Sequence, residues 1–281
     1  MLENLPPLRE VISEHGLGAR KALGQHFLLD LNLTRKIARL CEAEAGDVIL
    51  EVGPGPGGLT RALLETGADV VAVERDRRVM PILDELAAAT GRLKAVEADA
   101  LCVDESILSL PTNSVIASNL PYNISTELLV KWLTVTPRFW RRMVLMFQKE
   151  VGERILAQPG TKSYGRLSVL AQAASSPKLG FHLPARAFTP PPKVDSSVLV
   201  FDDSPLPEGM AELQRITAAA FGQRRKMLRQ SLKPVFGPKL GDVLAEHGVE
   251  ETARAEELPV ATYLSLARSA LGATTEGTKR T

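Results

Sequence analysis

The feature that most constrains the fold is a buried strand followed at once by a glycine-rich turn and a helix. The strand is expected over 47–52, the turn over 53–58 and the helix through about residue 65. Glycine has no Cβ, so its main chain can approach a ligand closely. Gly53, Gly55 and Gly58 also satisfy the spacing GxGxxG. In a strand–turn–helix context this spacing favours a nucleotide-type cofactor site over a plain turn.

The same alternation continues along the chain. Further apolar, strand-like segments are expected at 68–73, 93–97, 115–118 and 143–147, with helices at 31–43, 76–89 and 124–133. Strands that alternate with helices form parallel βαβ units. We therefore expect an α/β fold with a Rossmann-like, doubly wound sheet.

Composition suggests where the domains begin and end. Pro6-Pro7 and scattered glycines mark an arm, and a proline-rich linker follows Asp202. Beyond the linker the chain reads as helical to about residue 271, with loops near 234–238 and 248–258. We expect an N-terminal arm over 1–30, the α/β domain over 31–203, a small helical C-terminal domain over 204–273 and a tail over 274–281.

The bulk composition is that of a soluble globular protein. The 281 residues are 44% hydrophobic and carry a formal net charge of +1. The N-terminus does not resemble a secretory signal, and no apolar run is long enough to span a bilayer. The two cysteines and four histidines lack metal-ligand spacing. We expect a cytoplasmic protein without a bound metal.

Two carboxylates follow strands of the expected sheet. Glu74 ends the second strand, about 20 residues after the glycine turn, where an acid can accept ribose hydroxyls. Asp99 lies just past the third strand, where it can accept from an adenine amino group or serve as a turn acid. This pattern predicts a binding site for the adenosine of a cofactor. It does not distinguish NAD from S-adenosylmethionine, because both contain adenosine.

The fourth strand ends in Asn119-Leu120-Pro121-Tyr122. Its side-chain amide oxygen and the carbonyl before the proline can accept the two protons of an exocyclic amine. The tyrosine can stack on the face of an unpaired base. Asn-Leu-Pro is also ordinary turn chemistry, so a plain strand-ending turn is the alternative.

Several segments together resemble a known family. Glu51–Gly57 resembles the S-adenosylmethionine motif of class I methyltransferases, and Asn119–Tyr122 resembles the NLPY motif of ribosomal RNA adenine dimethyltransferases. Three further segments match that family: Lys21–Leu28, Phe188–Ser196 and Phe221–Leu228. The closest resemblance is to its bacterial small-subunit (16S) branch, the kasugamycin-resistance N6,N6-dimethyltransferases.

The resemblance implies a methyltransferase domain over 31–203, S-adenosyl-L-methionine as the methyl donor and 16S rRNA in the small subunit or its precursor as substrate. A role in ribosome biogenesis is implied too. Nothing in the sequence demands more than a monomer, which is the expected state. The implied cofactor-binding residues are His26, Leu28, Gly53, Glu74, Asp99 and Asn119. The implied catalytic residues are Asn119, Leu120, Pro121, Tyr122 and Phe188, the last packing the target base from its other face. His26 replaces the usual Asn of the family.

Three other functions stay open at this point. One is an N6-adenine methyltransferase for large-subunit rRNA or DNA, against which the Phe221–Leu228 segment argues. Another is an NAD-dependent dehydrogenase, although no hydride-transfer constellation is evident. The third is a largely non-catalytic ribosome assembly factor.

Charge is segregated along the chain despite the near-neutral total. No acidic residue lies between Glu127 and Glu150, or between Glu212 and Asp242, although both stretches carry several cations. Such segregation indicates a basic face for RNA phosphates, with a solvated helix face as the alternative. In the expected helix, the i, i+4 spacing puts Arg225 and Arg229 on one side. The expected RNA-binding residues are Arg141, Arg142, Arg224, Arg225, Lys226 and Arg229.

Overall fold

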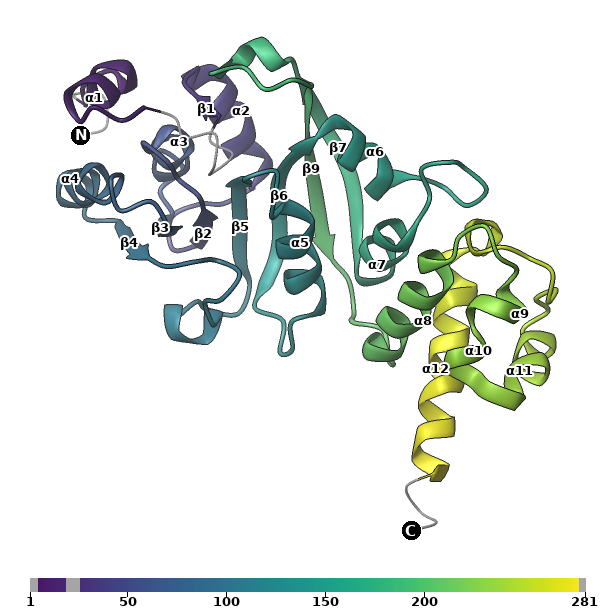
Figure 1. The fold of residues 1–281 in the computed structure, drawn as a ribbon. Coiled ribbons are helices and arrows are strands. Elements are labelled where there is room, and N and C mark those ends of the chain that lie inside the picture. The colour runs from purple at the N-terminus through teal and green to yellow at the C-terminus, as the bar shows by residue number, and fades with distance from the viewer. Residues whose placement is uncertain (1–4, 19–25, 278–281) are drawn as a thin grey trace. The chain divides into compact units, whose positions relative to one another are not determined.

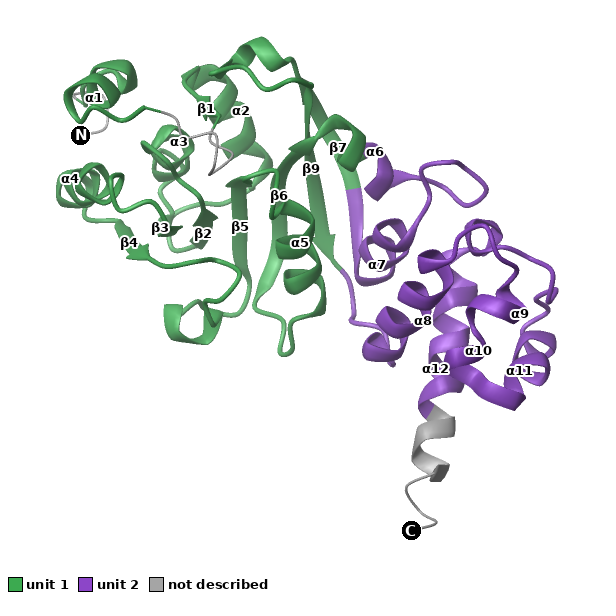
Figure 2. Ribbon diagram, viewed as in Figure 1, with its two compact units in different colours: residues 1–152, 178–203 green, residues 153–177, 204–281 purple. Residues whose placement is uncertain are grey.

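The computed structural model describes residues 5–18 and 26–277. Lys21–Gln25, part of one family-like segment, and the last residues of the expected tail lie outside this range. The chain divides into two compact units, 1–152 with 178–203 and 153–177 with 204–281 (Figure 2). Each unit is described by itself.

The domain boundary differs from the expected one at residues 153–177, which lie within the expected α/β domain. They group with the C-terminal helices because they bond to them. The Tyr164 hydroxyl donates to the Leu258 carbonyl (3.0 Å), and the Gly160 amide donates to the Glu256 carbonyl (2.7 Å). These partners lie more than 90 residues away in sequence, so local patterns could not reveal the grouping.

The first unit contains a seven-stranded sheet in the order β4-β3-β2-β5-β6-β9-β7 (Figure 1). The strands are β2 (Val48–Val52), β3 (Asp69–Glu74), β4 (Leu93–Glu97), β5 (Ser114–Asn119), β6 (Trp140–Gln148), β7 (Ser175–Leu183) and β9 (Ser196–Asp203). The pairs from β4 to β6 are parallel, whereas β9 runs antiparallel to β6. The doubly wound α/β sheet expected from the sequence is confirmed, but β7 was not predicted.

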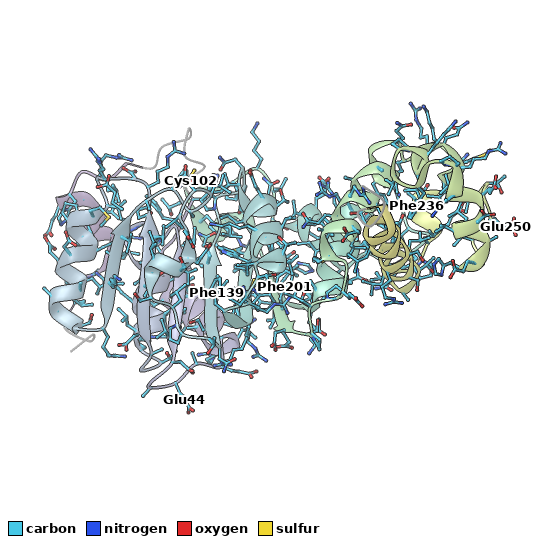
Figure 3. All side chains as sticks on the ribbon, turned by 90° about the horizontal axis from the view of Figure 1, so that it is seen from below. Glu44, Cys102, Phe139, Phe201, Phe236 and Glu250 are labelled. Carbon is cyan, nitrogen blue, oxygen red and sulfur yellow. The ribbon has the colours of Figure 1, made fainter. Side chains whose placement is uncertain are left out.

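Helices α1 (Leu8–Glu14), α2 (Leu31–Leu40), α3 (Gly58–Leu64), α4 (Met80–Thr90) and α5 (Ser125–Thr134) belong to this unit. Strands such as β2 and β5 are buried along most of their length, which explains their nearly continuous apolar sequence. Phe201 on β9 is labelled in Figure 3. It packs edge-on against Phe147 on β6, and both side chains are buried.

The expected N-terminal arm contains the helix α1, which the sequence did not predict. Leu8 and Val11 are three residues apart on one face and are buried. Beyond the undescribed segment, β1 (Phe27–Leu28) pairs antiparallel with β8 (Phe188–Thr189) in a small separate sheet. The arm is therefore built into the first unit.

The second unit is helical. It contains α7 (Arg166–Ala174), α8 (Met210–Gly222), α9 (Leu228–Ser231), α10 (Lys233–Phe236), α11 (Leu240–Glu246) and α12 (Val260–Gly277). Helix α6 (Lys149–Leu156) bridges the boundary of the two units in sequence. Helix α12 continues to Gly277, into the segment predicted as a tail. Among the described residues, no helix is long and apolar enough to cross a membrane.

Candidate active site

The sheet order brings four sequence-predicted residues into one row. Asp99, Glu74, Gly53 and Asn119 lie at or just past the carboxyl ends of β4, β3, β2 and β5, which are consecutive in the sheet. All four line one cleft, together with His26, Leu28 and Tyr122. Ligands of open α/β sheets bind at this edge. Two segments expected to serve a cofactor and a target amine thus meet in a single site.

The glycine turn is shaped for close approach. Gly53 and Gly55 have φ of 69° and 52°, a conformation that side-chain-bearing residues rarely adopt. A Cβ on Gly58 would stand 2.6 Å from the carbonyl oxygen of Leu28, so only glycine lets β1 pack against the start of α3. The turn therefore forms one wall of the cleft and also holds β1 at its rim.

Glu74 organises the turn as well as facing the cleft. Its Oε1 accepts from the amides of Arg75 and Asp76 (both 2.8 Å), and its Oε2 accepts from the amide of Gly55 (3.2 Å). Burial raises the pKa of its carboxyl, and the three amides oppose that shift. A carboxylate offers about four acceptor sites. Oε2 therefore keeps a site for a ligand hydroxyl.

Asp99 is held from two sides. Its Oδ1 accepts from the Leu101 amide (3.0 Å), and its Oδ2 pairs with Arg75 (3.1 Å). The loop after it is fixed by Lys131, whose ammonium donates to the carbonyls of Ala100 (3.0 Å) and Val103 (2.6 Å). The sequence did not identify Lys131 as a positioning residue, since its acceptors lie about 30 residues upstream.

Asn119 has a defined amide orientation. Its Nδ2 donates to the main-chain carbonyl of His26 (3.1 Å). With the nitrogen committed to that bond, Oδ1 is left as the acceptor for another ligand. Leu120, 1% exposed, and Pro121 complete the turn, and Pro121 packs near Gly53. The amide oxygen at the end of β5 is therefore the atom of Asn119 that can accept a hydrogen bond.

Tyr122 and His26 also line the cleft. The Tyr122 hydroxyl shares a 2.7 Å hydrogen bond with Ser196 Oγ, and its ring stacks on His26 with centroids 5.7 Å apart. His26 Nδ1 lies 2.8 Å from the Pro190 carbonyl. Because a carbonyl only accepts, Nδ1 carries the proton. His26 thus acts through its main chain on Asn119 and through its ring on Tyr122.

Phe188 does not lie where the sequence predicted. It is 3% exposed, belongs to the hydrophobic core and is not among the residues that line the cleft. The main chain of Phe188 pairs with Leu28 in the small sheet, and its side chain is buried in the core. In this conformation Phe188 offers no ring face to a base in the cleft.

The cleft residues lie within a region of the chain that matches a known protein family. The sequence matches the family described as ribosomal RNA adenine dimethylase over residues 16–271. The chain belongs to this family. Ribosomal RNA small subunit methyltransferase A of Phenylobacterium zucineum is 56% identical over 269 residues, covering 95% of this chain and 93% of that protein. The same-named protein of Maricaulis maris is 53% identical over 279 residues, covering 95% and 96%.

Two solved structures of rRNA or adenosine methyltransferases are similar to this chain in fold. A dimethyladenosine transferase from Plasmodium falciparum has a TM-score of 0.74 at 26% identity, covering 86% of this chain and 96% of that one. The 23S rRNA methyltransferase ErmE, with a TM-score of 0.65 at 24% identity over 86% of this chain and 98% of that one, shares the fold. At the level of the family, the expected class I methyltransferase fold and S-adenosylmethionine-dependent rRNA adenine dimethylation are confirmed.

Two of the cations expected to bind RNA are engaged inside the first unit. Arg141 donates to the Glu42 carbonyl (2.9 Å) and pairs with Asp47 (3.1 Å), while Arg142 pairs with Glu42 and with Asp202 (2.8 Å). The local stretch lacks acids, but folding brings acids from distant segments to these arginines. We therefore leave Arg141 and Arg142 out of the RNA surface.

The second basic segment is not one helix. Helix α8 ends at Gly222 and α9 begins at Leu228, so the helical spacing of Arg225 and Arg229 is wrong. The amide of Leu228 donates instead to Ala253 (2.8 Å), and Met227 bridges to Arg254. Arg224 contacts the Thr161 carbonyl (3.2 Å) and Glu256 (3.6 Å). Arg225, Lys226 and Arg229 are exposed.

Proposed function

We propose that this chain transfers methyl groups from S-adenosylmethionine to the N6 amine of adenines in small-subunit rRNA, giving N6,N6-dimethyladenine during ribosome biogenesis. The observation that carries the proposal is the amide of Asn119. Its nitrogen is held by the His26 carbonyl and its oxygen is left to accept, beside the glycine turn and the ring of Tyr122. We propose a cytoplasmic monomer that uses no metal. The described residues contain no cluster of three or more metal-ligating side chains.

The cleft fits the proposed cofactor. Asp99, Glu74 and Gly53 follow one another along the sheet edge, which suits adenine, ribose and the methionine portion in that order. Glu74 Oε2 retains an acceptor site, and the positive φ of Gly53 and Gly55 gives the turn a main-chain shape that side-chain-bearing residues rarely adopt. When bound, S-adenosylmethionine supplies a methyl group already activated on a sulfonium.

The residues of the chain act mainly on the target amine. The N6 lone pair of adenine is delocalised into the ring, which makes it a poor nucleophile. Asn119 Oδ1 and the Leu120 carbonyl accept hydrogen bonds from its two N–H groups. These bonds favour a pyramidal nitrogen with a localised lone pair. Tyr122, anchored through Ser196, stacks on the base. Positioning supplies much of the acceleration, and the proton of the resulting ammonium leaves to water.

The test of this function is methyl transfer to small subunits from cells that lack the modification. Purified protein with labelled S-adenosylmethionine should label their rRNA, and digestion should yield dimethyladenosine. Subunits already modified serve as the control and should accept little label. Binding of the subunits without any transfer would contradict the proposal and favour the assembly-factor function. Transfer to large-subunit rRNA or DNA alone would favour the other methyltransferases.

We propose that Arg224, Arg225, Lys226 and Arg229 of the second unit contribute to RNA binding, with Arg224 also holding the Thr161 loop. Changing Arg225→Glu together with Arg229→Glu should weaken subunit binding and make its dependence on salt shallower, by about 0.7–0.9 in log–log slope per lost phosphate contact. Filter binding over a salt series measures both quantities.

The matched control is Arg39→Glu with Lys94→Glu, which changes net charge equally at exposed positions of the first unit. This pair should leave the salt slope nearly unchanged. If the two double variants changed affinity and salt slope equally, only net charge would matter. Arg225 and Arg229 would then have no place in the RNA-binding proposal.

A further inference from the structure

The loop after β4 carries Asp99 to the cleft and is tied to that residue by its main chain. The carbonyl of Asp99 accepts from the amides of Cys102 and Val103 (both 2.9 Å). Its Oδ1 accepts from the Leu101 amide (3.0 Å). Ala100 also lines the cleft. Because Oδ1 is committed to the loop, Oδ2 is the carboxylate oxygen that can serve a ligand.

The ion pair between Asp99 and Arg75 does not fix this oxygen by itself. The Arg75 side chain is 72% exposed. Exposed ion pairs are screened by water and contribute little to stability. The position of Oδ2 therefore depends on what holds the main chain of the loop.

Lys131 on α5 holds that main chain from the side of the protein interior. Its ammonium donates to the carbonyls of Ala100 (3.0 Å) and Val103 (2.6 Å), one on each side of the turn. It also pairs with Glu105 (2.9 Å). An ammonium has three donors, so each has a partner here. Hydrogen bonds from a charged donor are stronger than neutral ones, which makes Lys131 the main support of the loop.

Glu105 and Trp132 keep the ammonium in place. Glu105 lies at the start of the 3-10 helix η3 (Glu105–Leu108) and is 8% exposed. Its Oε1 also accepts from the indole nitrogen of the buried Trp132 (3.1 Å). The carbonyl of Trp132 in turn accepts from the indole nitrogen of Trp140 (2.7 Å). Buried charges are screened by salt much less than exposed ones, so this support does not depend on the solvent.

Helix α5 is itself anchored to the turn that ends β5. The Ser125 hydroxyl donates to the carbonyl of Tyr122 (3.1 Å), and the Ile124 amide donates to the carbonyl of Pro121 (3.1 Å). Lys131 follows on the same helix. Its ammonium is therefore fixed relative to the cleft, and through it so is the loop.

A carboxylate held in this way can distinguish one nucleobase from another. A base with a 6-amino group donates to the carboxylate, whereas a base with a 6-oxo group presents an acceptor and leaves both groups without a partner. Rejection of the second base requires that the carboxylate cannot turn away. We propose that Lys131, held by Glu105, is a positioning residue that makes the cofactor site specific for adenine. The inference rests on the proposed function, which assigns adenine to Asp99, and extends it.

Calorimetry with two ligands tests this without any methyl transfer. S-adenosylhomocysteine and S-inosylhomocysteine differ at the 6-position of the base. The wild type should bind the first about a hundredfold more tightly. Lys131→Met keeps an unbranched side chain and loses the donors. Its affinity for S-adenosylhomocysteine should fall about tenfold, and its preference should narrow to about tenfold or less, because the carboxylate can then move away from the 6-oxo group.

Two further variants separate positioning from other effects. Lys94→Met makes the same change at an exposed position on β4 and should leave the preference at the wild-type value. Lys131→Arg keeps a cation with several N–H donors and should retain most of the preference. A role in stability alone would weaken both ligands equally and leave their ratio unchanged, which would overturn the inference.

A double variant guards against loss of folding. Lys131→Met leaves the buried carboxylate of Glu105 without its cation, so the melting temperature should fall. Adding Glu105→Gln removes that charge and keeps an acceptor for Trp132. The double variant should melt closer to the wild type and still lack the preference for adenine. Recovery of the preference together with stability would contradict a positioning role for Lys131.

The outcomes also separate this inference from the proposed function. A wild type that binds both ligands equally would overturn the assignment of adenine to Asp99 and the role of Lys131 with it. A wild-type preference that survives in Lys131→Met would overturn only the role of Lys131. A preference lost in Lys131→Met, in a protein that transfers no methyl group to rRNA, would support that role and contradict only the proposed methyl transfer.

Discussion

Changing Asn119→Ala is expected to reduce methyl transfer by about a hundredfold or more, the scale seen when one preorganised hydrogen-bonding group is removed from a reacting centre. The variant loses the Oδ1 acceptor for the target amine. It also frees the carbonyl of His26, so S-adenosylhomocysteine binding should weaken moderately and not vanish. Single-turnover transfer and calorimetry separate the two effects.

The matched control is Asn32→Ala, which removes the same side chain from an exposed position on α2. It should transfer methyl groups at the wild-type rate. If Asn119→Ala kept its activity within about threefold of wild type, the amine would not be held by this amide.

Changing Glu74→Ala is expected to weaken S-adenosylhomocysteine binding by about ten- to a hundredfold, because hydrogen bonds to a charged group contribute about 1.5–3 kcal/mol. The variant removes an acceptor for the ribose and leaves the amides of Gly55, Arg75 and Asp76 without their partner. The glycine turn should loosen as well. Calorimetry with the wild type as reference measures the loss.

Glu97→Ala is the control for this change. Glu97 is the register partner of Glu74 on β4, but it is exposed, pairs with Arg77 and does not line the cleft. Its removal should leave ligand affinity unchanged. Comparable losses in the two variants would mean that Glu74 acts only through the stability of the sheet.

Much of the fold could be predicted from local patterns. The glycine turn, the parallel strands 47–52 to 143–147 and the helices between them follow from hydrophobic periodicity and glycine positions, which are properties of short segments. The helix α1 and the strand β7 were missed. Strand β7 has mostly exposed or half-buried residues and so lacks a clear apolar pattern, and α1 is short.

The candidate site could be predicted as a set of residues but not as a geometry. The sequence predicts that Asn119 accepts from the target amine, but the orientation of its amide depends on a carbonyl 93 residues away. The sequence predicts that the ring of Tyr122 stacks on the base, but not that its hydroxyl bonds to Ser196, 74 residues later. Glu51 also lines the cleft, and a charged residue inside an apolar strand is a signal that could have marked it.

By itself, the sequence determined the α/β class, the glycine turn, the acids that end β3 and follow β4, and the amide that ends β5. These depend on the order of residue types within a few positions. Only the tertiary structure decided that Phe188 packs into the core, that Arg141 and Arg142 pair with distant acids, and that the chain between α8 and α9 is not helical. The reason is physical: the free energy of burial and of ion pairing depends on neighbours that folding brings together from remote segments.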